Sequence, residues 1–486
     1  MRSTTSCILL AICIAVAIPS GDAIGMRSLR VQRGLREPVA ARSARAPILR
    51  WITQPVDHFN TRDNRTWSMR YYENDQFLSG PNPPILIMLG GEWEITTGWL
   101  QSGQMFNIAS AHGAIMYYTE HRYYGGSRPT EDTRSENLQY LNVDQALADV
   151  AYFIEAKKKE RGLESSKVVV FGGSYAGNMA TWARLKYPHL IQGALASSAP
   201  VFAKADFYEY YEVVTEALRR SDSRCPLAVN QAFESIEELL RTPKGPSRLT
   251  KFFQLCEPLD ATNSLDVSSF AEALASSFAG VVQYDEVDST GKTGADRICE
   301  VMTSSALGSP LQRLAYLTRL TSDCRDVKYR STVEFYSATE WESPAVSGSM
   351  RSWLYQTCAE YGYYQTANSN KSVFGSLFTI ETYHELCKDL YGDYYTPALL
   401  ESAVKRTNIV YGGNNPDVRN IIFANGDLDP WHVLSVLEDV GDSAPAIVVP
   451  DSSHCQDLYS DAATDSAKMT AAKARIRKIV GEWIAS

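Results

Sequence analysis

The sequence predicts an α/β fold, in which a parallel, doubly wound sheet is interrupted by a large helical insertion. Over residues 84–202, short apolar or β-branched runs alternate with amphipathic runs of helix formers, the pattern of strand–helix–strand repetition. From about residue 203, helical periods and clustered cysteines replace this alternation, and strand patterns return after residue 404. We therefore expect one domain in two parts, 47–202 and 404–486, around an insertion at 203–403.

The predicted strands are short and apolar, as buried parallel strands are. They cover residues 84–89, 114–118, 167–171, 193–196, 420–424 and 446–449. Residues 143–154 place their apolar side chains on one helical face, and residues 178–187 form a helix that Pro188 ends. A closing helix is predicted over residues 466–484.

A serine stands at one strand–helix junction, in the run Gly172-Gly173-Ser174-Tyr175-Ala176. A strand–turn–helix around Gly-x-Ser-x-Gly is typical of a nucleophile elbow, which exposes the serine hydroxyl at the top of an α/β-hydrolase sheet. Ala176 stands where the motif more often has glycine, but alanine is still small. The alternative is an ordinary glycine-rich turn. The flanking strand and helix favour the nucleophile, and with it an α/β-hydrolase sheet carrying a helical cap.

An activated serine needs a histidine base and an orienting acid, which in this fold follow the serine in the order acid, then histidine. Asp427 and Asp429 follow the strand at 420–424, and His454 follows the strand at 446–449. Parallel strands place their carboxyl ends at one edge of the sheet, where ligands bind. We predict His454 as the base and leave both aspartates open at this point. Three of the other histidines precede Ser174 and two lie elsewhere in the chain: His58, His112 and His121, and then His189 and His384. His432 shares a loop with Asp429 and would have to fold back across its own turn to reach that carboxylate.

The loop after the strand at 84–89 begins Gly90-Gly91-Glu92. Hydrolases of this fold bind the oxyanion with the N–H of the residue after the nucleophile and an N–H from such a loop. We therefore predict an oxyanion hole formed by Tyr175 and Gly91. A simple strand-ending turn is the alternative for the glycine pair.

The N-terminus indicates secretion. Residues 1–23 combine Arg2, an apolar core and small residues before Ala23, which is typical of a signal peptide. Residues 24–46 are rich in arginine and lack an apolar period, so they predict a propeptide or a flexible arm. No later run predicts a membrane span, and the net charge of −9 argues against nucleic acid as a partner. We expect a secreted or lysosomal/endosomal protein.

Seven cysteines follow the signal peptide, and six of them lie between Cys225 and Cys387. In an oxidising compartment they predict disulfides within the insertion. None has the close Cys-x-x-Cys spacing of a zinc site, so no metal or other cofactor is expected. Asn64 and Asn370 begin glycosylation sequons.

Beyond these motifs, the chain closely resembles the family of prolyl carboxypeptidase, dipeptidyl peptidase II and thymus-specific serine protease. The resemblance runs from about Gln54 to the C-terminus and rests on the stretches 54–60, 70–72, 120–125, 142–149, 172–175, 353–365, 420–431 and 453–454. It implies a triad of Ser174, Asp429 and His454, with the insertion as a helical cap. It also suggests the disulfides Cys225–Cys299, Cys256–Cys324 and Cys358–Cys387, which leave Cys455 unpaired.

The pair His454-Cys455 stands where the carboxypeptidase and dipeptidyl peptidase branches have His-His, and it looks more like the thymus-specific branch. The resemblance implies a serine exopeptidase acting on short peptides after proline or a small residue, through an acyl-enzyme. Trp431 is expected to form one wall of the substrate pocket. Glu92 or Glu94 is expected to bind a terminal amine if the enzyme is an aminopeptidase, and the choice between carboxypeptidase and aminopeptidase action is left open. The alternatives are an esterase or lipase of the same fold and a non-catalytic binding protein. Assembly as a homodimer is left open.

Overall fold

The computed structural model of this protein describes residues 35–288, 290–319 and 324–486. The predicted signal peptide, residues 1–23, and the first part of the arginine-rich segment, residues 24–34, lie outside the described residues. Residues 35–46 run along the surface of the α/β domain and lead into its first strand.

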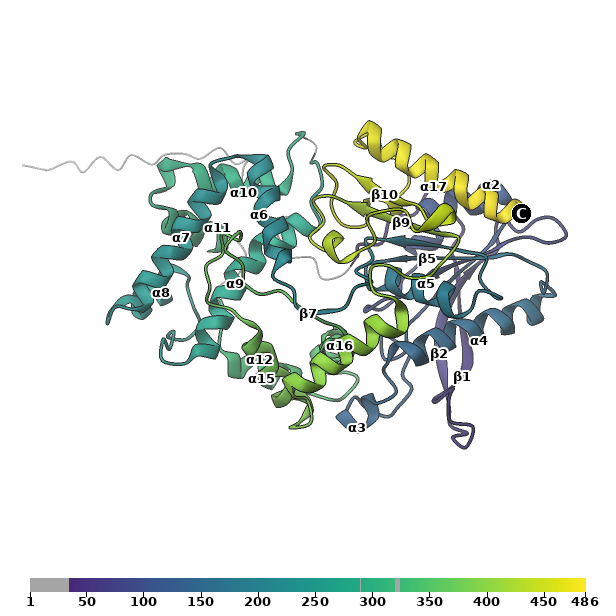
Figure 1. The fold of residues 1–486 in the computed structure, drawn as a ribbon, viewed down its shortest axis with the longest axis horizontal. Helices are drawn as coiled ribbons and strands as arrows, with labels where there is room; N and C mark the ends of the chain where they lie inside the picture. Colours follow the sequence, from purple (N-terminus) through teal and green to yellow (C-terminus); the bar gives the residue numbers. More distant parts are fainter. Residues whose placement is uncertain (1–34, 289, 320–323) are drawn as a thin grey trace, which may run out of the picture.

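A mixed sheet of eight strands forms the centre of the α/β domain, with the helical insertion to one side (Figure 1). The first strand pairs antiparallel with the second and the second antiparallel with β4, while all other neighbours in the sheet are parallel. This is the strand order of the α/β-hydrolase fold, which confirms the predicted fold class. In spatial order the strands are β1 (Ile48–Pro55), β2 (Thr66–Asn74), β4 (Ile115–Thr119), β3 (Ile85–Leu89), β5 (Val168–Gly173), β6 (Gly193–Ser197), β9 (Ile421–Gly426) and β10 (Ala446–Val449).

Helices cover both faces of this sheet because its central strands are apolar on both sides. Along β5, Val168 and Val170 belong to one hydrophobic cluster and Val169 and Phe171 to another, as the alternation of a strand requires. The first cluster contains side chains of the helices α4 (Val143–Arg161) and α5 (Tyr175–Lys186). The second contains α2 (Gln104–His112) and α17 (Ala467–Ala485), which lie on the opposite face in Figure 1.

The insertion forms a helical cap that lies beside the carboxyl edge of the sheet. Three disulfides join Cys225 to Cys299, Cys256 to Cys324, and Cys358 to Cys387, which is the pairing that the resemblance implies. Its elements are β7 (Lys204–Asp206), β8 (Gly362–Tyr364), α6 (Glu209–Ser221), α7 (Cys225–Leu240), α8 (Gly245–Phe252), α9 (Ser264–Gln283), α10 (Gly294–Thr303), α11 (Pro310–Arg319), α12 (Tyr329–Tyr336), α13 (Pro344–Ser347), α14 (Met350–Gln356), α15 (Ile380–Tyr391) and α16 (Pro397–Tyr411). One further short helix, α3 (Ser135–Leu138), belongs to the α/β domain.

The cap and the sheet share a hydrophobic core. Phe233 and Phe278 of the cap belong to the same cluster as the side chains under α4 and α5. At the return of the chain, Tyr411 of α16 stacks on Trp182 of α5 with ring centroids 4.6 Å apart. Continuous apolar packing of this kind resists relative motion. The cap is therefore held as a fixed roof over the carboxyl edge of the sheet.

Helix α9 is long and apolar enough to cross a membrane by length and composition alone, and 50% of its most apolar window is buried. Its apolar side chains, among them Phe270, Leu274 and Phe278, pack in the shared core. Burial explains its composition, because the central helix of a domain is apolar on most of its faces.

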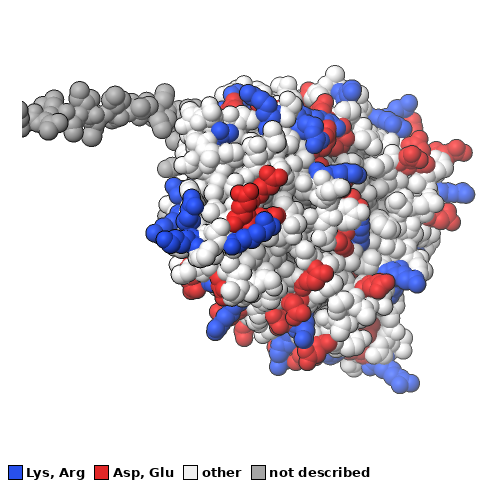
Figure 2. All heavy atoms as spheres, turned by 60° about the vertical axis from the view of Figure 1, so that its left-hand side comes forward, with Lys and Arg blue, Asp and Glu red and all other residues white. Residues whose placement is uncertain are grey.

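On the cap side of the molecule, basic and acidic groups are interspersed (Figure 2).

Candidate active site

Ser174 sits in a strained turn between β5 and α5. Its backbone has φ 58° and ψ −132°, and its N–H donates to the carbonyl of Ser197 over 2.9 Å. A non-glycine residue in such a conformation is destabilised by about 1–3 kcal/mol unless its surroundings impose it. The close contact lies at Gly172, where a Cβ atom would approach the carbonyl oxygen of Ala176 to 2.0 Å. Only glycine fits at residue 172, whereas Ala176 itself is accommodated.

A buried carboxylate–imidazole pair forms at the ends of β9 and β10. Nδ1 of His454 lies 2.8 Å from Oδ2 of Asp429, and both side chains have 0% exposure. The N–H of Trp431 donates to the other carboxylate oxygen over 3.0 Å, which fixes the orientation of Asp429. Within the described part of the chain, Nε2 of His454 is buried without a hydrogen-bond partner. The pair therefore presents an imidazole nitrogen that is free to form a hydrogen bond.

Burial opposes a charge on His454, but the negative charge of Asp429 outweighs it, and the pKa of His454 lies well above its usual value. An imidazole with a raised pKa accepts a proton readily. No hydrogen bond joins Nε2 to the Ser174 hydroxyl among the described residues. Catalytic hydrogen bonds are often long or poorly aligned before a substrate binds, so the lack of this bond does not by itself exclude proton transfer from Ser174.

Asp427 makes different contacts. Its Oδ1 accepts the N–H of Asp451 over 2.7 Å, and its Oδ2 pairs with Nη1 of Arg220 on α6 over 2.9 Å. These bonds join the loops after β9 and β10 to the cap. The geometry thus separates the two aspartates, because only Asp429 contacts His454.

The end of α9 holds the histidine loop. The N–H of His454 donates to the carbonyl of Gln283 over 3.0 Å. Ser453 Oγ and Gln456 Nε2 both donate to the carbonyl of Asp285, over 2.7 and 2.8 Å. Sequence reasoning missed this clamp, because carbonyl groups at a helix end carry no side-chain signal. The cap therefore holds the loop of the predicted base, His454, as well as lining the cavity.

A cavity of about 320 Å³ lies against Ser174. Trp431 forms one wall, in contact with the rings of Phe207, Tyr210 and Tyr363 at centroid distances of 5.4, 5.6 and 5.5 Å. Most of its other lining comes from the cap: Ser276, Ala279, Gly280, Gln283, Tyr284, Gly348, Ser349, Met350, Trp353 and Gln365. Three lining residues, Trp353, Tyr363 and Gln365, lie in the motif stretch 353–365, but nothing in that stretch assigned them to the pocket.

The two predicted oxyanion donors lie at the start of a helix and just after a strand. Tyr175 is the first residue of α5, and first-turn N–H groups have no acceptor within their helix. Gly91 follows β3, and a Cβ atom there would lie 2.5 Å from the Trp93 ring. Backbone at a glycine can approach a ligand closely. Tyr175 and Gly91 remain predicted donors.

The side chain of Tyr175 is fixed from three directions. Its hydroxyl lies 3.1 Å from Nε2 of His121, 2.8 Å from Nε2 of Gln356 and 3.3 Å from the hydroxyl of Tyr361. Burial lowers the pKa of His121 to about 4, so this imidazole is neutral at neutral pH. The residue that supplies the predicted oxyanion N–H is therefore anchored to both the α/β domain and the cap.

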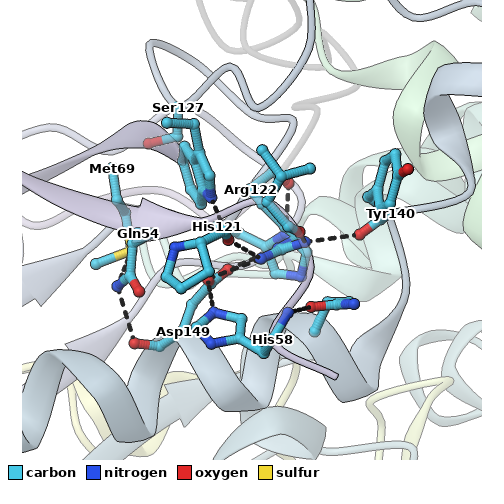
Figure 3. A network of polar contacts seen from close by, with 12 residues as sticks. Gln54, His58, Met69, His121, Arg122, Ser127, Tyr140 and Asp149 are labelled. Carbon is cyan, nitrogen blue, oxygen red and sulfur yellow. Dashed lines mark hydrogen bonds and ion pairs between the residues drawn. The ribbon is translucent and has the colours of Figure 1, made fainter. Parts of the chain in front are cut away.

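Arg122, next to His121, anchors that side of the site (Figure 3). Its guanidinium binds both carboxylate oxygens of Asp149, over 2.6 and 2.8 Å, and donates to the carbonyls of Val56 and Tyr140. Nε2 of His58 lies 2.7 Å from the same carboxylate. Burial alone would raise the pKa of Asp149, but the Arg122 charge lowers it below its usual value. His58 thus belongs to this network.

Glu92 lines the same cavity as Ser174. Its Oε2 is buried and has no hydrogen-bond partner among the described residues. Burial raises the pKa of Glu92 to about 7. An unpaired buried carboxylate is costly unless a ligand compensates it.

Asn64 and Asn370, the predicted glycosylation sites, are exposed, and no cluster able to hold a metal occurs in the described residues.

The sequence of this chain is similar to those of known proteins over most of its length. The sequence profile of the family described as serine carboxypeptidase S28 matches residues 54–476. The thymus-specific serine protease of Mus musculus is 37% identical over 457 residues, covering 89% of this chain and 87% of that protein. The lysosomal Pro-X carboxypeptidase of Bos taurus is 28% identical over 498 residues, covering 99% and 97%. The higher identity to the thymus-specific protease agrees with the His454-Cys455 pattern.

Among solved structures, proline iminopeptidase of Mycobacterium smegmatis aligns over 90% of this chain and 99% of that one, with 11% identity and a TM-score of 0.38. The assignment of the fold rests on the strand order of the sheet instead.

The two aspartates are expected to differ sharply on substitution. Asp429→Asn should lower kcat by about 10⁴-fold, because His454 loses the carboxylate that fixes its tautomer. It should also move the acid limb of the residual activity to lower pH, since the charge that raises the pKa of His454 is gone. Asp427→Asn, the matched control, breaks a half-exposed ion pair and should change kcat less than about tenfold. Steady-state kinetics on both variants tests this. A large loss of kcat in Asp427→Asn, with kcat little changed in Asp429→Asn, would contradict the assignment.

Proposed function

Because this chain belongs to the serine carboxypeptidase S28 family, we propose that it is a secreted or lysosomal serine exopeptidase that cleaves short peptides after proline or a small residue. The observation that carries the proposal is the buried Asp429–His454 pair on the same edge of the sheet as the strained Ser174. The three disulfides and the name of the lysosomal Pro-X carboxypeptidase relative support the compartment.

The proposed reaction follows the serine-peptidase scheme. The Ser174 hydroxyl adds to the carbonyl carbon of the scissile bond while its proton passes to Nε2 of His454. The resulting oxyanion is bound by the N–H groups of Tyr175 and Gly91. His454 then returns the proton to the leaving amine as the C–N bond breaks, which leaves an ester on Ser174. Water attacks that ester by the same steps and restores the hydroxyl.

The aromatic walls suit a proline on the acyl side of the scissile bond. The pyrrolidine ring is compact and its φ is fixed, so it fits a shallow apolar pocket without losing rotamer freedom. Trp431, Tyr210 and Tyr363 supply such walls beside Ser174. The indole N–H of Trp431 is buried and has no partner among the described residues, so it is available to a substrate carbonyl.

The cap limits the length of the substrate. Much of the cavity lining belongs to the cap, which shares its core with the α/β domain. A fixed roof of this kind excludes folded proteins and admits a peptide by one terminus. The name of the Pro-X relative refers to the carboxyl end of a substrate, while the site itself offers a carboxylate, Glu92, for the amino end.

The charges around the cavities favour capture of an amino terminus. Glu92 lines the cavity beside Ser174, and its Oε2 has no hydrogen-bond partner among the described residues. A second cavity, of about 260 Å³, borders His454 and carries groups of both signs: Arg36, Lys292 and Arg297 against Asp285, Glu286 and Asp288. Arg297 is paired with Asp288 and Lys292 with Glu300. This mixed lining gives less reason to expect capture of a free carboxylate.

A peptide panel tests the proposed function. We expect the purified protein to release a dipeptide from X-Pro or X-Ala arylamides faster than it removes the final residue from Pro-X peptides. Faster removal of the final residue would show that the enzyme is an exopeptidase that acts at the carboxyl terminus instead of the amino terminus. Cleavage of long internal sequences or of lipid esters, with neither exopeptidase reaction, would refute the proposal and favour an endopeptidase or an esterase. No hydrolysis of any substrate would favour a binding protein.

Glu92→Gln tests the capture of the amine. The substitution should raise KM for dipeptide arylamides at least about tenfold, because the substrate ammonium loses a buried ionic partner. N-acetylated arylamides should respond little. The exposed Glu94 on the same loop provides the control Glu94→Gln. Equal effects on free and acetylated substrates would contradict the assigned role of Glu92.

The pKa of Glu92 adds a pH signature. The carboxyl pairs with an ammonium only when it is ionised, so the preference for a free over an acetylated N-terminus should be lost as the pH falls through about 7. The ratio of kcat/KM for the two substrates isolates this titration from that of His454. In Glu92→Gln the ratio should be low and independent of pH. A ratio that titrates equally in the variant would assign the effect to another group.

A further inference from the structure

The segment just before β1 reaches back to the catalytic elbow. Leu35 has 7% exposure and belongs to the hydrophobic cluster that also contains Cys455 and Leu458. A Cβ atom at Gly173 would lie 3.0 Å from Cδ2 of Leu35 and 3.0 Å from Sγ of Cys455. Leu35 therefore packs against the residue that precedes the nucleophile. A segment that the sequence places in a propeptide or flexible arm contributes here to the packing of the site.

Glu37 caps the loop that carries the predicted oxyanion donor. Its carboxylate accepts the N–H of Thr96 over 2.9 Å and the N–H of Gly98 over 2.8 Å, and it also accepts the Thr96 hydroxyl. Gly98 begins the short helix η1 (Gly98–Leu100), which ends the loop that starts at Gly90. Acidic groups stabilise helix N-termini by satisfying such N–H groups. Glu37 thus fixes one end of the loop whose other end holds Gly91.

Additional bonds attach this segment along its length. The hydroxyl of Tyr459, five residues after His454, donates to the carbonyl of Arg36. Further on, the N–H of Ala41 donates to the carbonyl of Gln101 over 3.0 Å, and the N–H of Arg45 to Oε1 of Gln76 over 2.6 Å. Residues 35–46, named here the N-terminal strap, thereby join the histidine loop to the loop after β3.

We infer that the N-terminal strap stays in the mature enzyme, that Glu37 is a positioning residue for the oxyanion loop, and that proteolytic maturation cuts before Leu35. The inference rests on the proposed hydrolase function of Ser174. Arginines precede the strap at Arg27, Arg30 and Arg33, so the Arg33–Gly34 bond is the last arginyl bond that leaves Leu35 in place. Cleavage at Arg36–Glu37 would remove Leu35 and put a new ammonium on Glu37 beside its own carboxylate.

The N-terminus of the secreted protein is the first test. Mass spectrometry of its N-terminal peptide should find a start at or before Leu35. A fully active protein that starts within the strap or at Pro47 would overturn the inference. This measurement needs no substitution, so it is unaffected by variants that fail to fold.

Glu37 is tested by substitution in the full chain, expressed and secreted in the same way as the wild-type protein. Glu37→Ala should lower kcat and the rate of fluorophosphonate labelling at Ser174 by roughly 10- to 100-fold, with KM changed little, because a small displacement of the donor weakens oxyanion binding. Glu37→Gln keeps one acceptor oxygen and should recover part of the rate. Val39→Ser, at a strap side chain with 83% exposure, is the control.

The outcomes separate this inference from the proposed function. If Glu37→Ala labels at the wild-type rate, or loses rate only in proportion to lost folded protein, Glu37 has no positioning role. If the wild-type protein labels at Ser174 but hydrolyses no peptide, the exopeptidase proposal fails. The labelling rates of the Glu37 variants then still decide the role of the strap.

Discussion

The close approach of β5 to α5 is the constraint on which the site depends. A Cβ atom at Gly172 would lie 2.0 Å from the carbonyl of Ala176, so strand and helix meet only because residue 172 is glycine. The turn between them forces Ser174 to a φ of 58°, and the bond from its N–H to Ser197 holds it there. This arrangement places the serine at the carboxyl edge of the sheet, with the first N–H groups of α5 beside it.

The other parts of the site are fixed to this elbow from three sequence regions. The loop after β10 brings His454 to Asp429, and the end of α9 in the cap binds the N–H of His454. Gln356, also in the cap, binds the hydroxyl of Tyr175. The N-terminal strap contacts Gly173 and the loop after β3. Cap and strap are therefore parts of the proposed catalytic apparatus, because each contacts a residue adjacent to the chemistry.

The sequence was most informative where burial is complete. The predicted strands at 84–89, 114–118, 167–171, 193–196, 420–424 and 446–449 occur with ends displaced by two residues or fewer, since central parallel strands are continuous apolar runs. The strands β1 (Ile48–Pro55) and β2 (Thr66–Asn74) were not predicted, because β1 is an exposed edge and β2 alternates exposed and buried residues. Contacts between distant segments escaped prediction for a related reason. Glu37 binds main-chain groups 59 and 61 residues away, and no local pattern encodes them.

The nucleophile is the central claim, and Ser174→Ala tests it most directly. The variant should be secreted with an unchanged melting temperature, because the substitution removes one hydroxyl oxygen from a half-buried side chain. Hydrolysis of the best arylamide should fall by about a million-fold, as loss of the nucleophile does in serine peptidases. Substantial hydrolysis retained by a folded Ser174→Ala protein, after removal of contaminating peptidases, would contradict the account.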